Sequence, residues 1–322
     1  MNKRRKLIIQ NNEISKLYTF NLGGFNQKVL IEGKKKEFPI VINLHGGPGS
    51  PIPFSVGCRG MFPEFTDELI MVYLDQYGCG INNAKIDDTF CIDTFVKMTE
   101  DLVQEIKNIF PNNPIYMFAT SWGSILSAKI LETPNCNVDG VVVWGQIIKS
   151  VFFNEEVYSE LQKSEKARKH IDAIKNTDIK NITNSDLKLV SSCIKKYTDG
   201  YTNKNGETAP MGDVIKGLLT SPDYKFRDFK AIMVNGYSKN LSLWKEILQV
   251  DLEEALKNIQ VPYMIIQGDT DIVASTTYVQ KTVEHCQNPN LTCTIVKDSG
   301  HFPGTDGMNM VLEKARMLET GR

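Results

Sequence analysis

The chain has 322 residues, and its 37 Lys and Arg are balanced by 38 Asp and Glu, which leaves a formal net charge of -1. Hydrophobic residues make up 41% and charged residues 23%, proportions typical of globular proteins and far from those of disordered chains. Because no overall basic field is present, we expect neither nucleic acid nor an anionic lipid surface as a partner.

The N-terminus does not resemble a secretory signal, because the apolar stretch Leu7–Ile9 is far shorter than the about 7–15 residues that such a signal needs. Nowhere do about 18 apolar residues run together, so no membrane-spanning helix is expected. The seven cysteines form no Cys-x-x-Cys pair, which indicates reduced thiols and a cytoplasmic location. We expect the basic runs Lys3–Lys6 and Lys34–Lys36 at a frayed terminus and in a solvated turn, respectively.

The first predicted elements are strands. The runs Lys16–Asn21 and Lys28–Glu32 flank a Gly-Gly pair, which predicts an antiparallel hairpin, and the apolar run Phe38–Leu44 follows. Beyond it, strands and helices alternate, so we predict a mostly parallel eight-stranded sheet with helices on both faces. The remaining strands are predicted at Leu69–Leu74, Ile115–Ala119, Val141–Val143, Tyr263–Gln267 and Cys293–Val296, and the helices at Ile92–Phe110, Trp122–Leu131, Thr276–Cys286 and Met308–Leu318.

The alternation stops between residues 147 and 250. This stretch is rich in Lys, Asn, Ser and Glu and has helical periodicity, as in Val151–Ile174 and Ser185–Tyr197. It is much longer than the about 2–6 residues of an ordinary strand-to-helix connection. Since the strand pattern continues afterwards, we favour an inserted helical cap over a second domain in tandem. The predicted organisation is a core at 1–146, a cap at 147–250 and the rest of the core at 251–322.

Ser121 follows an apolar strand and precedes a helix, in Ala119-Thr-Ser-Trp-Gly123. That context is required of a nucleophile elbow, a sharp strand-to-helix turn that projects a serine clear of its neighbours and needs small flanking residues. By itself the motif is weak, because a serine that merely caps a helix has the same appearance. A serine nucleophile also needs a histidine to remove its proton and a carboxylate to orient that histidine.

His301 is the histidine that fits this requirement. When the serine lies on such an elbow, the acid and the histidine follow it in the chain, which excludes His45. His170 lies in the predicted cap and His285 in a helical pattern. His301 instead follows a strand, in the loop Asp298-Ser-Gly-His-Phe-Pro, where we expect an exposed imidazole.

Two carboxylates compete for the orienting role. The strand Tyr263–Gln267 ends in Gly268-Asp-Thr-Asp271, at the carboxyl end where open α/β sheets have their sites. Either aspartate could instead bond its own backbone in a solvated turn. We favour Asp271, because four residues into the loop the chain has turned back toward the site, while Asp269 shapes the turn.

The attacked carbonyl becomes an oxyanion, which needs two backbone N–H donors. One is expected from the residue after the serine, Trp122, and the other from a loop that follows an earlier strand. That loop is His45-Gly-Gly-Pro-Gly-Ser50, in which Gly47 is the expected donor because glycines let the backbone approach a ligand closely.

Three segments resemble motifs of the α/β-hydrolase superfamily and, within it, of the proline iminopeptidases: His45-Gly-Gly-Pro-Gly-Ser50, Asp75-Gln-Tyr-Gly-Cys-Gly80 and Thr120-Ser-Trp-Gly-Ser124. The family has Arg where this chain has Tyr77, and its elbow has Gly-Gly before the serine where this chain has Ala-Thr. The resemblance implies the α/β-hydrolase fold and release of an N-terminal residue, often proline, from short peptides without a metal or cofactor.

Family members are expected to hold the free amino group of the substrate with cap glutamates. In the family, one of these glutamates lies in a segment that reads like Arg-Ile-Glu-Asn-His-Tyr-Phe. The segment of this chain that compares with it, Lys230–Lys239, contains no carboxylate. Glu155, Glu156 and Glu160 could replace the missing charge as substrate-binding residues, although acids at a helix N-terminus also form solvated faces that the helix dipole favours.

Three functions therefore compete: an aminopeptidase acting on small peptides, a carboxylesterase or amidase acting on a small metabolite, and a ligand sensor without catalysis. The chain has no His-Glu-x-x-His, Walker or Gly-x-Gly-x-x-Gly motif, so we expect neither metal nor nucleotide cofactor. The sequence does not indicate an oligomeric state.

Overall fold

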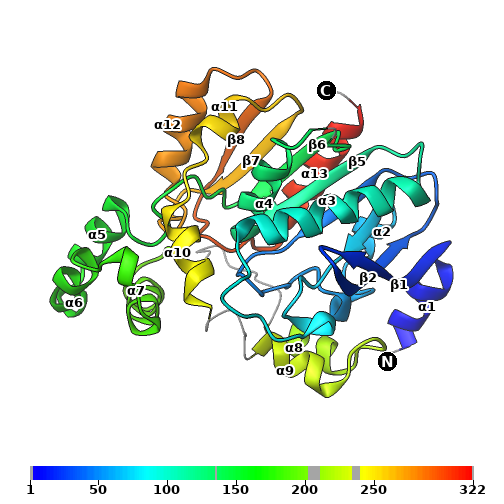
Figure 1. The fold of residues 1–322 in the computed structure, drawn as a ribbon, viewed down its shortest axis with the longest axis horizontal. Helices are drawn as coiled ribbons and strands as arrows, with labels where there is room; N and C mark the ends of the chain where they lie inside the picture. The colour runs from blue at the N-terminus through cyan, green and yellow to red at the C-terminus, as the bar shows by residue number, and fades with distance from the viewer. Residues whose placement is uncertain (1–2, 135, 202–210, 234–239, 321–322) are drawn as a thin grey trace.

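The computed structural model describes residues 3–134, 136–201, 211–233 and 240–320. In this part of the chain eight strands form a sheet in the order β1-β2-β4-β3-β5-β6-β7-β8 (Figure 1). The β1–β2 and β2–β4 pairs are antiparallel and the other neighbours are parallel. The strands are β1 (Ile14–Leu22), β2 (Phe25–Gly33), β3 (Ile40–Leu44), β4 (Ile70–Tyr73), β5 (Ile115–Thr120), β6 (Gly140–Trp144), β7 (Tyr263–Gly268) and β8 (Leu291–Val296). The predicted mostly parallel sheet is confirmed.

Helices cover both faces of the sheet, because the apolar strands bury side chains on each side. One buried cluster includes residues of α3, α4, α11 and α12, and the other includes residues of α2 and α13. These helices are α2 (Pro63–Thr66), α3 (Ile92–Ile109), α4 (Trp122–Ile130), α11 (Glu253–Lys257), α12 (Thr276–Cys286) and α13 (Thr305–Thr320). Among the described residues, none of the helices is both long and apolar enough to cross a membrane.

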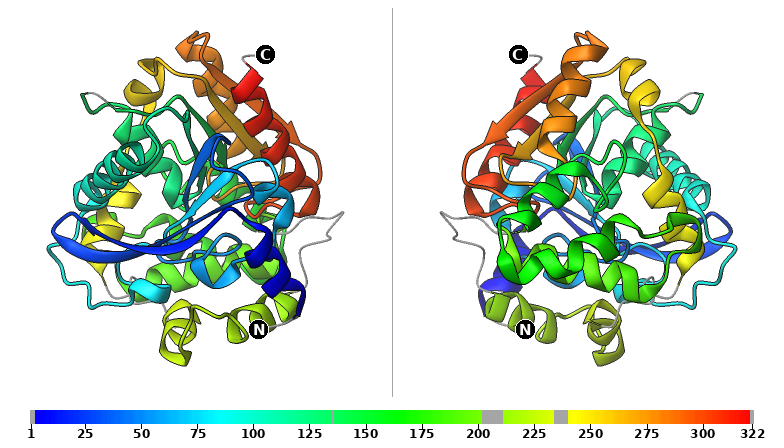
Figure 2. Two further views of the ribbon diagram at one scale, coloured as in Figure 1. Left: turned by 90° about the vertical axis from the view of Figure 1, so that its right-hand side faces the viewer. Right: turned by 90° about the vertical axis from the view of Figure 1, so that its left-hand side faces the viewer.

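Further helices lie between β6 and β7, in the stretch predicted as a cap. They are α5 (Glu155–Gln162), α6 (Glu165–Lys175), α7 (Asn184–Tyr197), α8 (Met211–Leu219), α9 (Phe226–Met233) and α10 (Leu241–Gln249), with a short 3₁₀ turn η3 (Ile179–Asn181). Helices α5, α6 and α7 form one group at one end of the molecule, while α8 and α9 lie near the N-terminal helix (Figures 1 and 2). The division into core and cap stays a prediction.

The expectation of a frayed N-terminus is wrong. Lys3–Asn11 forms helix α1, and Arg5 is buried. Its guanidinium donates to the carbonyl oxygen of Gly57 within the 3₁₀ turn η1 (Val56–Cys58) and to that of Arg59 just after it. It also donates to the carbonyl oxygen of Gly217 in the last turn of α8, at 2.9 Å. The last carbonyls of a helix have no partner within it, so a cation finds acceptors there. Arg5 therefore ties α1 to the core and to α8.

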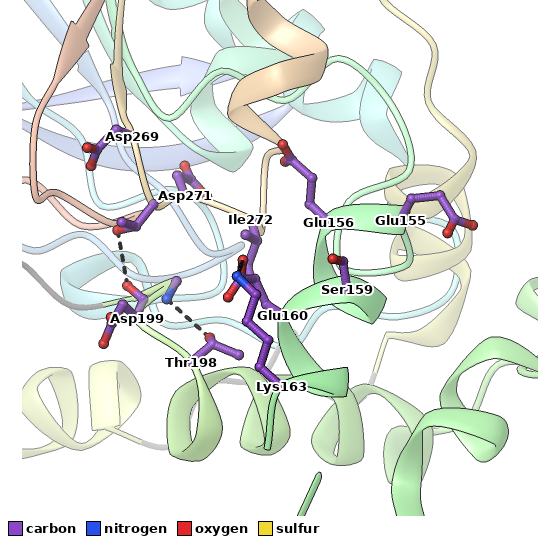
Figure 3. Close-up of a pocket in the computed structure, with 12 residues that line it drawn as sticks. Glu155, Glu156, Ser159, Glu160, Lys163, Thr198, Asp199, Asp269, Asp271 and Ile272 are labelled. Carbon is purple, nitrogen blue, oxygen red and sulfur yellow. Dashed lines mark hydrogen bonds and ion pairs between the residues drawn. The ribbon is translucent and has the colours of Figure 1, made fainter. Parts of the chain in front are cut away.

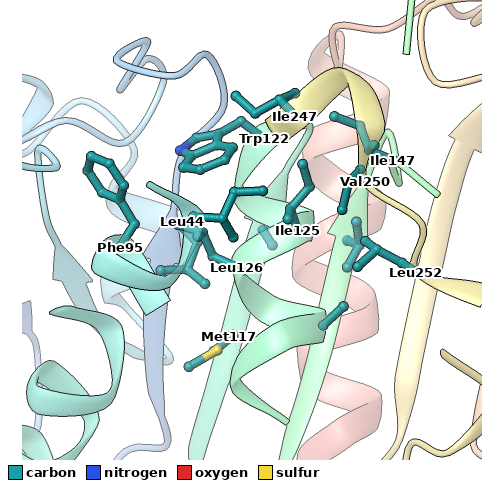
Figure 4. Close-up of a cluster of buried hydrophobic side chains, with 14 of the residues drawn as sticks. Leu44, Phe95, Met117, Trp122, Ile125, Leu126, Ile147, Ile247, Val250 and Leu252 are labelled. Atoms are coloured by element: carbon teal, nitrogen blue, oxygen red, sulfur yellow. The ribbon is translucent and has the colours of Figure 1, made fainter. Parts of the chain in front are cut away.

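Buried side chains also hold the elbow between β5 and α4 (Figure 4). The indole of Trp122 is fully buried, with the ring of Phe95 packed edge-on at 5.7 Å and Ile247 of α10 nearby. Ile125 and Leu126 extend the same cluster along α4. Since this apolar packing surrounds the first turn of α4, it fixes where Ser121 lies relative to the sheet.

Candidate active site

Ser121 occupies a strained turn at the junction of β5 and α4. Its backbone has φ 50° and ψ -117°, a conformation that non-glycine residues rarely adopt. Its N–H donates to the carbonyl oxygen of Trp144 at 3.1 Å. A Cβ on Gly123 would lie 1.9 Å from the carbonyl oxygen of Leu44, so the start of α4 packs against the end of β3 only because this residue is glycine. This geometry is that of the predicted elbow.

Ser121, His301 and Asp271 come together at the carboxyl ends of β5, β8 and β7. The Oγ of Ser121 lies 2.7 Å from Nε2 of His301, and Nδ1 of His301 lies 2.8 Å from Oδ2 of Asp271. The three side chains are therefore connected in series by hydrogen bonds. In this arrangement a histidine can accept the serine proton while the carboxylate holds the ring.

Asp271 is held by donors on both of its oxygens. The N–H groups of Val273 and Ala274 donate to Oδ1 at 2.9 and 3.0 Å, and Nε2 of Gln267 donates to Oδ2 at 3.0 Å. Asp269 points elsewhere, since its Oδ1 accepts the N–H of Ser299 at 3.1 Å. Asp269 thus ties the loop after β8 to the loop after β7.

His301 is only 5% exposed, so the expectation of an exposed imidazole is wrong. Its backbone N–H donates to the carbonyl oxygen of Gly200 at 2.8 Å, and the ring of Tyr201 packs edge-on against the imidazole. Below it, the indole of Trp144 donates to the carbonyl oxygen of His301 at 3.1 Å. Gly200 and Tyr201 therefore cover the histidine. The sequence alone did not predict that this segment lies at the site.

The loop that carries Gly47 lies directly against the elbow. A Cβ on Gly46 would lie 3.3 Å from the carbonyl oxygen of Thr120 and 3.4 Å from Cβ of Ser121, so the two segments are in close contact. Gly47 has φ 122°, which favours glycine. The structure therefore brings Gly47 and Trp122, the two expected donors, to the same edge of the sheet as Ser121.

A pocket of about 190 Å³ opens onto Ser121 and His301, and we call it the Ser121 pocket. None of its described lining residues is an Asp, Glu, Lys or Arg. The rest of the lining includes Gly46, Gly47, Ile52, Pro53, Phe152, Tyr201, Phe302 and Pro303. A pocket of this size and composition suits a small uncharged group.

Glu155, Glu156 and Glu160 do not line the Ser121 pocket. Helix α5 places them in a separate hollow of about 620 Å³, the acidic pocket, whose other wall carries Asp269 and Asp271 (Figure 3). The two pockets share no described lining residue. In the described part of the chain these three glutamates therefore border a different hollow from the one that opens onto Ser121, and their role in substrate binding stays a prediction. Of the comparable segment Lys230–Lys239, residues 234–239 lie outside the described residues.

Sequence reasoning missed several polar side chains that support the site. Gln267 is the last polar residue of an apolar strand, and this position just before Gly268-Asp-Thr-Asp271 was a usable signal. His45 and Gln76, which are buried behind the Gly47 loop, both lie in segments that resemble family motifs, and this was their only signal, since the contact between them joins residues 31 apart in the chain. Burial lowers the pKa of His45 to about 4, so its imidazole is neutral near pH 7.

Comparison with known proteins places this chain in a family. A model of the alpha/beta hydrolase fold matches residues 39–307. A probable aminopeptidase, YbaC of Bacillus subtilis strain 168, is 21% identical over 316 residues, which are 92% of this chain and 94% of that protein. A crystal structure of proline iminopeptidase from Mycobacterium smegmatis superimposes with a TM-score of 0.62 at 15% identity, covering 95% of this chain and 98% of the other.

A crystal structure of carboxylesterase CesB from Bacillus subtilis is also similar, with a TM-score of 0.58 at 15% identity and coverage of 99% of this chain and 97% of the other. At such identities the superpositions establish the fold, and the family match extends through every strand from β3 to β8. This chain belongs to the alpha/beta hydrolase fold family.

Proposed function

We propose that this hydrolase is a serine aminopeptidase of the proline iminopeptidase type, which releases N-terminal residues from short peptides through an acyl-enzyme. The observation that carries the serine mechanism is the series of hydrogen bonds from Ser121 through His301 to Asp271, at 2.7 and 2.8 Å. We also retain the prediction of a cytoplasmic location, where the seven cysteines, all unpaired here, would stay reduced.

In the first step, Nε2 of His301 takes the Oγ proton of Ser121 while Oγ attacks the substrate carbonyl carbon. The carbonyl oxygen becomes an oxyanion that accepts hydrogen bonds from the N–H groups of Gly47 and Trp122. Asp271 keeps Nδ1 of the imidazolium bonded and stabilises its charge. When the intermediate collapses, Nε2 protonates the leaving amine and the carbon–nitrogen bond breaks.

In the second step, a water molecule replaces the leaving amine. His301 removes one proton of this water as the oxygen attacks the acyl carbon, and then returns a proton to Oγ of Ser121 when the ester bond breaks. The free carboxylic acid leaves and the enzyme returns to its starting state.

The aminopeptidase assignment rests on sequence relatives and motifs. The probable aminopeptidase YbaC matches across nearly the whole chain, and Asp75-Gln-Tyr-Gly-Cys-Gly80 and Thr120-Ser-Trp-Gly-Ser124 resemble iminopeptidase motifs. A second candidate, hydrolysis of a small ester or amide, is favoured by the Ser121 pocket, where no described lining residue carries a charge for a protonated amine.

A substrate panel separates the two. We expect turnover of prolyl- and alanyl-p-nitroanilide, and loss of that turnover when the amino group is acetylated. Activity confined to p-nitrophenyl acetate or butyrate, with blocked and free anilides equally inert, would replace the aminopeptidase by the esterase.

Covalent labelling tests the serine mechanism itself. A fluorophosphonate probe should label the native chain at Ser121 and leave Ser121→Ala unlabelled. A well-folded native sample that resists the probe and hydrolyses nothing in the panel would favour the sensor without catalysis.

A further inference from the structure

His45 and Gln76 lie buried at the ends of β3 and β4 and do not line the Ser121 pocket. The backbone N–H of Gln76 donates to Nε2 of His45 at 2.9 Å. Because Nε2 accepts this bond, the single ring proton of the neutral imidazole lies on Nδ1. Nδ1 is 2.8 Å from the carbonyl oxygen of Gly46 and donates to it. The backbone N–H of Gln76 therefore sets the tautomer of His45, although the two residues lie on different loops.

The Gly46 carbonyl belongs to the same peptide group as the N–H of Gly47. This peptide is trans, so its N–H points opposite to its C=O. Two donors hold the carbonyl: Nδ1 of His45, and the N–H of Ser50 at 3.1 Å. Fixing the carbonyl fixes the direction of the Gly47 N–H, and a carbonyl that accepts hydrogen bonds makes the N–H of its own peptide a better donor.

Gln76 also contacts Trp122, the residue expected to supply the second oxyanion donor. Its Oε1 accepts the indole Nε1–H of Trp122 at 2.8 Å, and its Nε2 donates to the carbonyl oxygen of His45 at 3.4 Å. The Trp122 indole can therefore neither rotate nor slide without breaking a buried hydrogen bond. One side chain thus connects the Gly47 loop to the first residue of α4.

We propose that His45 and Gln76 are positioning residues that hold the Gly47 and Trp122 N–H groups at the spacing an oxyanion needs. This inference rests on the proposed function. Neither residue lines the pocket, so His45 acts through the Gly46–Gly47 peptide and Gln76 through the Trp122 indole and the His45 carbonyl. Donors that are fixed in advance stabilise the transition state more than the bound substrate. Their loss should therefore lower kcat and the affinity for tetrahedral mimics, and leave KM nearly unchanged.

The sharpest test compares two replacements of His45. The side-chain amide of His45→Asn can donate from about the position of Nδ1, whereas His45→Leu is apolar and of similar size. We expect His45→Leu to lose about 10- to 100-fold in kcat, with KM within about threefold, and His45→Asn to recover most of that loss. A boronic acid that adds to Ser121 should bind His45→Leu more weakly by the same factor, while a reaction product binds both variants as it binds the native enzyme.

A second pair of variants tests the link to Trp122 if His45→Leu does not fold. Trp122→Phe and Gln76→Leu each remove the Trp122–Gln76 hydrogen bond. Each should lower kcat, and the double variant should lose little more than Gln76→Leu alone, because both changes remove the same interaction. Tyr116→Phe is the matched control, since it deletes a buried hydroxyl bond to the carbonyl oxygen of Leu318 at the other end of β5 and should keep kcat.

The outcomes separate the two hypotheses. A native enzyme that neither reacts with fluorophosphonate nor turns over the panel contradicts the proposed function. An active native enzyme whose folded His45→Leu and Trp122→Phe variants keep kcat and boronic acid affinity contradicts the positioning role. Additive losses in the double variant also count against it, and so does an equal loss of kcat in Tyr116→Phe.

Discussion

The Ser121 pocket and the acidic pocket are lined by neighbouring residues, since Tyr201 lines the first and Gly200 the second, yet their chemistry is opposite. The first is uncharged in its described lining and opens onto a serine that is hydrogen-bonded to a histidine. The second is three times larger, is lined by Glu155, Glu156 and Glu160, and does not reach Ser121. The acidic residues that the sequence places near the site therefore line a different hollow from the one that opens onto Ser121.

The two pockets differ because their side chains lie on different kinds of element. Ser121, Asp271 and His301 lie just beyond the ends of parallel strands, whose positions are tied to one another by the sheet ladder. The three glutamates lie on α5, whose place depends on packing within the inserted helices. The candidate triad is thus positioned by the sheet, whereas the three glutamates lie on a helix whose placement the sheet does not determine.

The largest effect expected is at Ser121. Ser121→Ala should lower kcat by about 10⁴-fold or more, because members of such a triad act as a unit. Steady-state hydrolysis of the best panel substrate measures this, and a melting curve checks that the variant is folded. Activity that survives the substitution would place the reaction elsewhere, with the acidic pocket as the first alternative.

A pH effect on stability is expected from His45, which is buried next to the Ser121 pocket. Burial lowers the pKa of His45 to about 4, from about 6.5 in an unfolded chain. Its contribution to stability is therefore complete above pH 6.5 and is lost as the pH falls toward 4, by about 3 kcal/mol in all. Cys79, whose Sγ lies 3.7 Å from Nε2, stays neutral there, because burial raises its pKa.

Urea unfolding between pH 4 and 7 measures this effect. His45→Asn should show a shallower loss of unfolding free energy over that range, since the other histidines and the carboxylates titrate alike in both proteins. Parallel curves for the two proteins would mean that His45 is not the group that makes the native fold acid-sensitive.

A smaller effect on catalysis is expected at Gln267, which is a donor to Asp271 outside both pockets. Gln267→Leu removes the bond to Oδ2 and should lower kcat by about 10- to 100-fold, since a hydrogen bond to a buried carboxylate is worth roughly 1.5–3 kcal/mol. Thr292→Ala, at an exposed position of β8, is a suitable control. Equal kcat values in the native enzyme and Gln267→Leu would show that the backbone donors of Val273 and Ala274 suffice.

The smallest effect is expected in the acidic pocket. Glu160→Gln removes a charge that pairs with Lys163 at the surface, and it should change kcat/KM for alanyl-p-nitroanilide by less than about twofold. In contrast, Phe152→Ala in the Ser121 pocket should raise KM for the same substrate several-fold by removing apolar contact. A large rise in KM for Glu160→Gln, confined to substrates with a free amino group, would restore the predicted role of the cap glutamates.

Most of the fold and the residues of the candidate triad could be predicted from sequence because both depend on short-range patterns. Alternating apolar segments predict the parallel sheet, and a serine between strand and helix, followed in order by Asp271 and His301, predicts which side chains meet. The burial of His301 could not be predicted, because the chain that covers it, Gly200–Tyr201, belongs to the inserted helices. Arg5 was likewise misjudged, since its partners are carbonyl groups at Gly57, Arg59 and Gly217.

The sequence by itself therefore determined the fold class, the order of the candidate triad along the chain and the glycines that permit the elbow and the loop at Gly47, since each is a local property of residue type and spacing. Only the tertiary structure decided that Asp271 faces His301 while Asp269 bonds the neighbouring loop, that the α5 glutamates border a separate pocket, and that His45 and Gln76 lie behind the expected oxyanion donors. These features depend on contacts between segments far apart in the chain, which residue patterns do not encode.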